Sequence, residues 1–408
     1  MSTKSVFTKH ILMGIKVEND RYINIKDGRI VSITADPEFD DSIVDLGRHS
    51  IVFPGLINTH SHAFQSLLKG YTDDCTLEVF LKIVYSKLEE FTIEDIYNGS
   101  RLAFSEMLQN GITTVCDFFY INGAGNGNAK AVIKAARDVG LRINLMRSII
   151  DLPGKSKKVR EDIDNYKTRF NALYAQYEKD ENVVITPCAH SVYYCTEEAI
   201  RSVKDIAQNY SVKWQIHFSD SQGTRDYCQT NFGKSNAEYM ADNQLMDENM
   251  VGVHGIWCDK QDIEIMANHK ISLSHNPLSN QFLGERPALI SEMLNNGIKV
   301  GLGTDGAASN PSLSILNEMR HAVLIQKARL LDPSKFGSLQ GFKMGTEHGG
   351  HLSGFEVGKF AKGFWADFMV CDTRDPTLNP YIEKALSYMV YSLSPRAIRK
   401  VYIGGKEV

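Results

Sequence analysis

Two histidines, His60 and His62, stand one residue apart at the end of a hydrophobic segment that starts at Ile51. On an extended strand, side chains two positions apart point to the same side, so both imidazoles can reach one metal ion. A His-x-His pair is a weak signal by itself, because many such pairs lie on solvated strands. The pair therefore predicts a metal site only together with further ligands from other parts of the chain.

More residues with ligand or acid–base side chains end short apolar segments further along: His217, His254, His275 and Asp305. The C-terminal ends of parallel strands in a barrel meet at one face, so we expect these side chains to come together. The predicted ligand set of one divalent ion is His60, His62, His217 and Asp305. Three imidazoles and a carboxylate suit Zn²⁺, with Fe²⁺ or Mn²⁺ as alternatives. Such an ion lowers the pKa of bound water toward about 7, which indicates a hydrolase.

Strand-like and helical segments alternate between residues 54 and 354. The strand-like segments are 111–117, 142–147, 183–187, 212–217, 250–254, 271–275 and 298–305, and the helical ones include 93–109, 129–139, 197–208 and 259–267. Alternation over about 300 residues favours a parallel sheet closed as a (β/α)8 barrel of the TIM type. An open doubly wound sheet is the alternative, but the first strand leads to histidines rather than to a Gly-rich phosphate loop.

Both ends of the chain read as short strands. Asp27-Gly28 separates two alternating segments and predicts a hairpin, and the segments 366–372 and 397–408 are also strand-like. We expect residues 1–53 and 355–408 to form one small composite β-sandwich domain beside a barrel over 54–354.

The bulk composition excludes several classes of protein. The 408 residues include 45 basic and 49 acidic side chains, a net charge of −4, without long runs of one sign. This gives no support for a nucleic-acid or membrane-surface partner. The N-terminus lacks the apolar core of a signal peptide, and no apolar run approaches the ~20 residues of a membrane span. Seven cysteines without a Cys-x-x-Cys pair indicate a reducing compartment. We expect a cytoplasmic protein with a small-molecule substrate.

Four motifs are specific in combination: Pro54-Gly-Leu-Ile-Asn-Thr-His-Ser-His62, Lys69-Gly-Tyr-Thr-Asp-Asp74, His275-Asn-Pro-Leu-Ser-Asn280 and Gly303-Thr-Asp-Gly-Ala-Ala-Ser-Asn310. With them the sequence resembles the amidohydrolase superfamily over nearly its whole length. The most similar subgroup is that of S-adenosylhomocysteine/methylthioadenosine deaminases, guanine deaminases and triazine hydrolases. The resemblance implies a distorted barrel with a composite β-sandwich, one metal ion, and a homodimer or larger homo-oligomer.

The resemblance also assigns roles to the strand-end residues. The family's metal ligands match His60, His62, His217 and Asp305, and Asp305 also takes the proton from the nucleophilic water. His254 matches the histidine that orients this water and stabilises developing charge. His275 lies in a matching motif, so we include it among the catalytic candidates.

Asp220 is the main departure from the family pattern. In the deaminases a glutamate three residues after the third histidine carries a proton to a ring nitrogen. Here that position is Asp220, which is shorter by one carbon–carbon bond, roughly 1.5 Å. Because general acid–base transfer needs heavy atoms within ~3.2 Å or one bridging water, the change predicts a closer substrate, a water relay or different chemistry. The structural alternative is an Asp that caps the next helix.

The residues that match substrate contacts are Gln65, Glu89, Tyr120, His190 and Ser309. Glu89 matches a purine-contacting glutamate, whereas Gln65 and Tyr120 match formiminoglutamate deiminase. That deiminase has an arginine three residues after the histidine matched by His190, and this chain has Tyr193 there. An acidic amino-acid substrate would therefore lack the arginine guanidinium that binds its carboxylate through two hydrogen bonds.

These features predict an aminohydrolase in which metal-activated water releases ammonia from a purine-, pterin- or triazine-like ring. One alternative is a formimino- or guanidino-type deiminase, or a ring-amide hydrolase, of the same superfamily. Another is a catalytically silent metal-binding ligand sensor. Arg147 and Arg160 are the candidates for holding a carboxylate or phosphate of the substrate.

Overall fold

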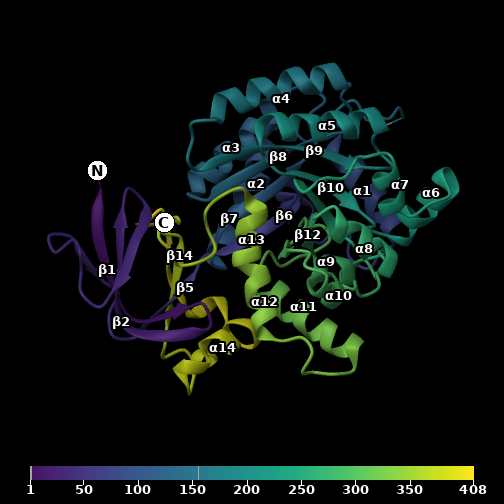
Figure 1. Ribbon diagram of the computed structural model, residues 1–408. Helices are drawn as coiled ribbons and strands as arrows, with labels where there is room; N and C mark the ends of the chain where they lie inside the picture. The colour runs from purple at the N-terminus through teal and green to yellow at the C-terminus, as the bar shows by residue number, and fades with distance from the viewer. Residues whose placement is uncertain (1, 155) are drawn as a thin grey trace.

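Eight parallel strands form the central sheet of the computed structural model, which describes residues 2–154 and 156–408 (Figure 1). The strands follow one another in chain order: β6 (Leu56–Ser61), β7 (Ile112–Phe119), β8 (Arg142–Ile149), β9 (Val183–Ser191), β10 (Trp214–Phe218), β11 (Met250–His254), β12 (Ser272–His275) and β13 (Val300–Leu302). An isolated parallel bridge between Ser61 and Asp305 joins the first strand to the segment after the last one. The sheet thus closes as the predicted barrel, and the alternative of an open sheet is wrong.

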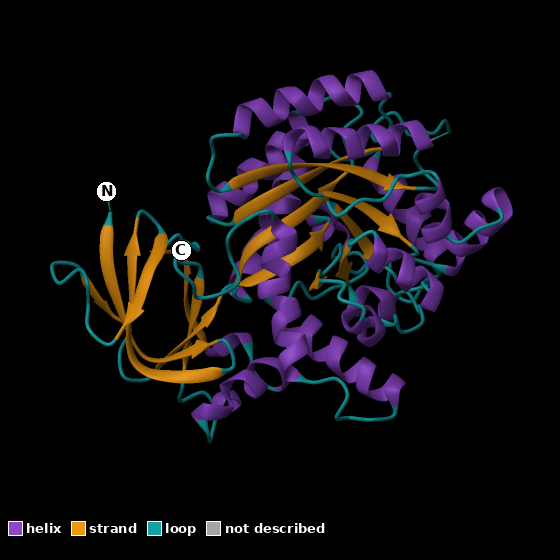
Figure 2. Cartoon of the chain, viewed as in Figure 1, coloured by secondary structure: helices purple, strands orange, loops and turns teal. Residues whose placement is uncertain are grey.

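Helices surround the barrel, as Figure 2 shows. They are α1 (Leu77–Leu88), α2 (Ile93–Gln109), α3 (Gly127–Val139), α4 (Ile163–Tyr177), α5 (Glu197–Tyr210), α6 (Gln222–Phe232), α7 (Asn236–Asp242), α8 (Lys260–Asn268), α9 (Pro277–Phe282), α10 (Ile290–Asn295), α11 (Ile315–Leu330), α12 (Ser338–Gly345) and α13 (Glu347–Ser353), with the 3-10 turn η1 (Ala63–Leu68). Because helices cover the outer face, strands such as β7 and β8 are buried at every position. Among the described residues, no helix has the length and apolar character needed to cross a membrane.

Side-chain caps fix where several helices begin. Thr92 and Asp95 form a capping box at the start of α2, and the Ser221 side chain accepts from the backbone N–H of Thr224 at the start of α6. Replacing such a cap by alanine costs about 1 kcal/mol. The Ser221 cap holds the turn between β10 and α6, and this turn carries Asp220.

The two ends of the chain form a second, mixed sheet beside the barrel (Figure 1). Its strands are β1 (Thr3–Met13), β2 (Lys16–Lys26), β3 (Arg29–Thr34), β4 (Ile43–Asp45), β5 (Ser50–Pro54), β14 (Phe368–Asp372), β15 (Ile398–Ile403) and β16 (Lys406–Glu407). β5 pairs antiparallel with β14, so N-terminal and C-terminal strands interleave as expected. The segment between β14 and β15 holds η2 (Pro376–Leu378), η3 (Ile382–Lys384), α14 (Ala385–Tyr391) and η4 (Pro395–Ala397).

A buried ion pair ties the barrel to the second sheet. Nε and Nη2 of Arg142, on β8, donate to the carboxylate of Asp367 at 3.0 and 3.2 Å, and the guanidinium lies 4.1 Å from the Trp365 ring centroid. Since both charges are desolvated, removing one partner would leave the other buried and unpaired. With β5 ending at Pro54 and α13 at Ser353, we propose the domain division 1–53, 54–354 and 355–408.

Candidate active site

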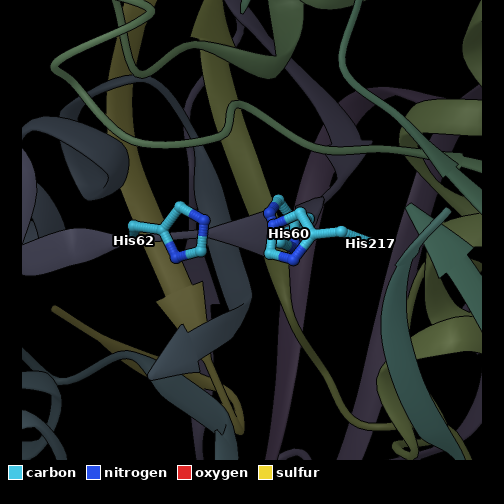
Figure 3. A group of neighbouring side chains, drawn as sticks. All are labelled: His60, His62 and His217. Carbon is cyan, nitrogen blue, oxygen red and sulfur yellow. The ribbon is translucent and has the colours of Figure 1, made fainter. Parts of the chain in front are cut away.

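Three histidine rings face one another at the C-terminal end of the barrel (Figure 3). His60 lies near the end of β6, His62 directly follows this strand, and His217 lies on β10; all three are buried. The ring centroid of His60 lies 4.7 Å from that of His62 and 5.1 Å from that of His217. One ligand nitrogen from each ring lies within 4.8 Å of the others, which is the spacing needed to share one ion. Residues 155 positions apart in the chain thus meet as the barrel geometry predicts.

Each of these rings is held by a hydrogen bond at Nδ1. The acceptors are Gln215 Oε1 for His60 (2.8 Å), the Phe118 carbonyl for His62 (2.7 Å) and the His190 carbonyl for His217 (2.9 Å). Because these oxygens only accept, Nδ1 carries the ring proton and Nε2 keeps its lone pair. This is the tautomer in which a histidine binds a metal through Nε2.

Asp305 completes the cluster from the segment after β13. Its Oδ1 lies 3.7 Å from Nε2 of His60 and 3.4 Å from Nε2 of His62, and its Oδ2 accepts from the Ser279 hydroxyl at 2.7 Å. Burial by itself raises the pKa of Asp305, but the neighbouring histidines and Ser279 together lower it below the usual range. The backbone of Asp305 has a φ of 60°, a left-handed conformation that is uncommon outside glycine and concentrates at functional sites.

The cluster fits a divalent metal ion. Burial, reinforced by neighbouring imidazoles, lowers the pKa of His60 well below its ordinary value and that of His217 to about 3. The rings are therefore neutral at pH 7, which is the form that ligates. Nε2 of His60 is buried and has no hydrogen-bond partner among the described residues, a costly arrangement unless a ligand binds there. Three imidazoles and a carboxylate are a donor set for zinc or a similar ion.

His254 lies at the end of β11, with its ring stacked 5.6 Å from that of His217. Its Nδ1 donates to Oδ1 of Asn280 at 2.9 Å and lies 3.3 Å from Nδ2 of Asn276. His254 also has a positive φ of 78°. Asn280 fixes the ring at the wall of the pocket, where a histidine can orient water or stabilise charge.

Asp220 lies in the same pocket as His254 and Asp305. Its Oδ2 accepts from the Tyr193 hydroxyl at 2.8 Å, and its Oδ1 accepts from the Thr224 hydroxyl. The N-cap of the following helix is Ser221, so the capping alternative for Asp220 is wrong.

The pocket brings together most of the predicted substrate contacts. Those that line it are Gln65, Tyr120, His190 and Ser309. Nε2 of Gln65 donates to the Tyr120 hydroxyl at 3.2 Å, and the Ser309 hydroxyl lies 2.8 Å from that of Ser279. Their positions agree with substrate-contacting roles, which stay predictions.

The structure does not bring Glu89 or His275 to the pocket. Glu89 follows the last residue of α1 and is exposed, and its backbone carbonyl accepts from the Lys158 ammonium instead. His275, at the end of β12, is buried and is not among the residues that line the pocket, and burial lowers its pKa to about 3. We therefore withdraw Glu89 as a substrate contact and His275 as a catalytic residue.

The two candidate arginines also lie elsewhere. Arg147 is fully buried and forms a two-pronged ion pair with Glu161, at 2.8 and 2.9 Å. Arg160 is exposed and donates to the carbonyl of Asp151. Neither side chain lines the pocket, so neither holds an anionic group of a substrate there.

Comparisons with known proteins identify the family. A sequence model of the amidohydrolase family matches residues 51–408. The chain belongs to the amidohydrolase family. Family membership confirms the expected enzyme class, a metal-dependent hydrolase of carbon–nitrogen bonds other than peptide bonds.

Individual members of the family match almost the whole chain. The "5'-deoxyadenosine deaminase" of Methanopyrus kandleri is 31% identical over 398 residues, 97% of this chain and 89% of that protein. The "5-methylthioadenosine/S-adenosylhomocysteine deaminase" of Thermodesulfovibrio yellowstonii is 30% identical over 399 residues, 95% of this chain and 88% of that protein. A zinc-bound adenosine deaminase from Xanthomonas campestris superposes with a TM-score of 0.90 at 22% identity, covering 99% of this chain and 92% of the other.

Sequence reasoning missed the residues that hold the amidohydrolase site in place. Gln215 fixes His60, Asn280 fixes His254, and Ser279 fixes Asp305. Ser279 and Asn280 could have been found from the sequence, because both lie in the motif His275-Asn-Pro-Leu-Ser-Asn280. Gln215 stands two positions before His217 on β10, so the two-residue period of a strand places both side chains on the same side.

We expect Gln215→Leu to weaken metal binding. The substitution removes the acceptor for Nδ1 of His60, which frees the ring to turn away from the cluster. Loss of such an outer hydrogen bond typically costs 10–100-fold in metal affinity. Competition with a chelator measures the change, and Gln229→Leu, on the exposed face of α6, is the matched control. Unchanged affinity in Gln215→Leu would show that this contact does not hold the ligand.

Proposed function

We propose that the protein is a zinc-dependent aminohydrolase that releases ammonia from an amino-substituted heterocycle, most simply an adenosine-type nucleoside. The observation that carries this proposal is the placement of Asp220 and His254 in one pocket with the cluster of His62, His217 and Asp305. A hydrolytic deamination needs an activated water, a base, and an acid for the ring nitrogen, and the pocket holds a candidate for each. The relatives named as 5'-deoxyadenosine and methylthioadenosine deaminases support this choice.

We assign the individual residues the following roles, which their contacts support. A divalent ion on His60, His62, His217 and Asp305 would lower the pKa of water and so supply a nucleophile at neutral pH. Asp305 takes the proton from this water, and His254, held at Nδ1 by Asn280, stabilises the charge that develops as the water attacks. Protonated Asp220 would deliver a proton to the ring nitrogen beside the reacting carbon. Asp305 would then pass the proton of the water to the amino group, which leaves the tetrahedral adduct as ammonia. The proton of the new hydroxyl would return to Asp220 as the carbonyl forms.

The pocket lining indicates a substrate without a negative charge. Among residues 2–154 and 156–408, no Lys or Arg side chain lines it, whereas Asp220, Asp305 and Glu285 do. Burial raises the pKa of Glu285, and Trp257 Nε1 donates to its carboxylate at 2.7 Å. One wall is apolar and is formed by α1 through Leu77, Phe80, Leu81 and Val84. This combination suits a flat, neutral ring with an apolar substituent, and a hydroxyl or amino donor for Glu285.

A second candidate is an acyclic deiminase. The hydrogen bond between Gln65 and Tyr120 places together the two residues that match formiminoglutamate deiminase. However, Tyr193 stands where that deiminase has its arginine, and the described lining offers no cation for a carboxylate. We therefore favour the heterocycle deaminase.

Ammonia release from a substrate panel tests the proposed function. The panel is 5'-deoxyadenosine, methylthioadenosine, adenosine, guanine, a pterin and N-formimino-L-glutamate, each incubated with zinc-loaded protein. We expect one of the neutral nucleosides to give the highest kcat/KM. Turnover of N-formimino-L-glutamate alone would establish the acyclic deiminase instead, and zinc-loaded protein that releases no ammonia from any compound would end the proposal.

We also expect strong discrimination against a phosphate on the substrate. Adenosine and adenosine 5'-monophosphate share the reacting ring, but the phosphate brings negative charge into a pocket lined by Asp220, Asp305 and Glu285 and, among the described residues, by no Lys or Arg. Like charges brought together cost several kcal/mol, so kcat/KM for the monophosphate should be at least about 100-fold lower. Steady-state kinetics on this pair measures the ratio. Equal kcat/KM values would contradict the neutral-substrate assignment while leaving deamination itself intact.

A further inference from the structure

Two residues singled out by the family resemblance, Asp220 and Tyr193, contact each other. Asp220 stands where the deaminases have a longer glutamate, and Tyr193 stands where a deiminase has an arginine. The two lie 27 positions apart in the chain, and the Tyr193 hydroxyl donates to Oδ2 of Asp220 at 2.8 Å. Both side chains line the candidate active site.

The aromatic surroundings fix the Tyr193 hydroxyl. Its ring centroid lies 4.8 Å from that of Tyr194, and 6.3 Å from those of His190 and Tyr227. A ring packed on several sides has few alternative orientations, so its hydroxyl offers a hydrogen bond at a set position. The donor is therefore in place before a substrate binds.

Tyr193 and Thr224 hold the two oxygens of Asp220 separately. Tyr193 donates to Oδ2, and Thr224 donates to Oδ1. With both oxygens held, the carboxylate cannot turn freely about its side-chain bonds. A proton donor works best when its geometry is set beforehand, and this matters most for a side chain that is one bond shorter than the usual glutamate.

We infer that Tyr193 is a positioning residue that compensates for the short side chain of Asp220. Its hydroxyl holds the carboxylate toward the substrate in the orientation that a glutamate reaches by its own length. The inference rests on the proposed function, because it assigns proton delivery to Asp220. Tyr193 itself gives up no proton in this scheme: Asp220 receives one and passes it to the ring nitrogen. Burial and the neighbouring Asp220 raise the pKa of Tyr193 well above its ordinary value, which agrees with a neutral hydroxyl.

A set of four proteins tests the inference: the wild type, Tyr193→Phe, Asp220→Glu and the double variant. The phenylalanine keeps the ring and removes one oxygen. We expect Tyr193→Phe to lower kcat about 10- to 100-fold, the range for one lost hydrogen bond to a charged group, with KM changed less than about threefold. In the Asp220→Glu background the same substitution should cost less than about threefold, because the longer side chain no longer depends on the hydroxyl.

Tyr97→Phe is the matched control, since the Tyr97 hydroxyl also donates to an aspartate, Asp138, at 2.7 Å, but on the surface. It should leave kcat and KM at the wild-type values. Kinetics with the best nucleoside of the panel, together with metal content and melting temperature, gives the readout.

The outcomes separate the inference from the proposed function. Wild-type kcat in Tyr193→Phe, a loss confined to KM, or equal losses in the two backgrounds would overturn the positioning role while deamination stands. A wild type that deaminates nothing would instead remove the proposed function, and the inference with it.

Discussion

Replacing Asp305 by asparagine should remove the bound metal and the activity together. Asparagine keeps the shape of the side chain, and its amide oxygen can still accept from the Ser279 hydroxyl, which now contacts Oδ2 at 2.7 Å. It removes the negative charge that lies 3.4 Å from Nε2 of His62 and 3.7 Å from Nε2 of His60. Metal ions contribute several kcal/mol to such reactions, so we expect at least a ~10³-fold loss of kcat/KM.

Elemental analysis of purified protein and ammonia release are the two measurements for Asp305→Asn. The control is Asp164→Asn, at the exposed start of α4, which should retain both metal and activity. A melting temperature near that of the wild type would show that the fold persists. Full metal content and full activity in Asp305→Asn would remove Asp305 from the ligand set and leave only the three histidines.

The barrel could be predicted because its signal is spread along the chain. Each strand is a short apolar segment, and several helices start at a recognisable cap, such as Thr92 before the predicted helix 93–109. Locating these segments requires only the local pattern of apolar and polar residues, which can be read from the sequence. The predicted helix at 129–139 begins instead at Gly127, where the Asn126 side chain makes no capping bond to the helix and the sequence therefore shows no sharp start.

The convergence of the site could be predicted for a geometric reason. His217 lies near the end of β10, His254 ends β11 and Asp305 follows β13. Parallel strands bring their C-terminal ends to one face. The bridge between Ser61 and Asp305 shows this directly, because the barrel closes at the candidate metal site itself. Their roles as ligands, base and orienting residue stay predictions, and Asp305→Asn tests the role of Asp305.

The site residues that were predicted wrongly, or not predicted at all, have side chains whose direction depends on loops and helix ends. Tyr85 of α1 lines the pocket, but Glu89, one helical turn or about 5.4 Å further along, lies beyond the end of the helix at Leu88. His275 ends a strand as His254 does, yet it is buried and is not among the residues that line the pocket. The contact between Tyr193 and Asp220 joins two loops, whose shapes a single sequence does not encode in any periodic pattern.

Replacing Asp220 by alanine should leave the metal in place but abolish most of the turnover. Asp220 lines the pocket, but the four candidate ligands hold the ion without it. Losing a general acid–base group lowers rates by about 10²–10⁴-fold, and we expect kcat for the best nucleoside to fall within this range. Metal content and ammonia release, measured on the same preparation, distinguish this outcome from that of Asp305→Asn.

The control for Asp220→Ala is Asp226→Ala, an exposed aspartate on the following helix, α6. It changes the same charge six positions away and should leave kcat unaltered. In the Asp220→Ala background, Tyr193→Phe should have no further effect, because the hydroxyl has lost the carboxylate that it donates to. Turnover that survives in Asp220→Ala would mean that another group protonates the ring nitrogen. His254 is then the candidate, because it lines the pocket and Asn280 already holds its ring in place.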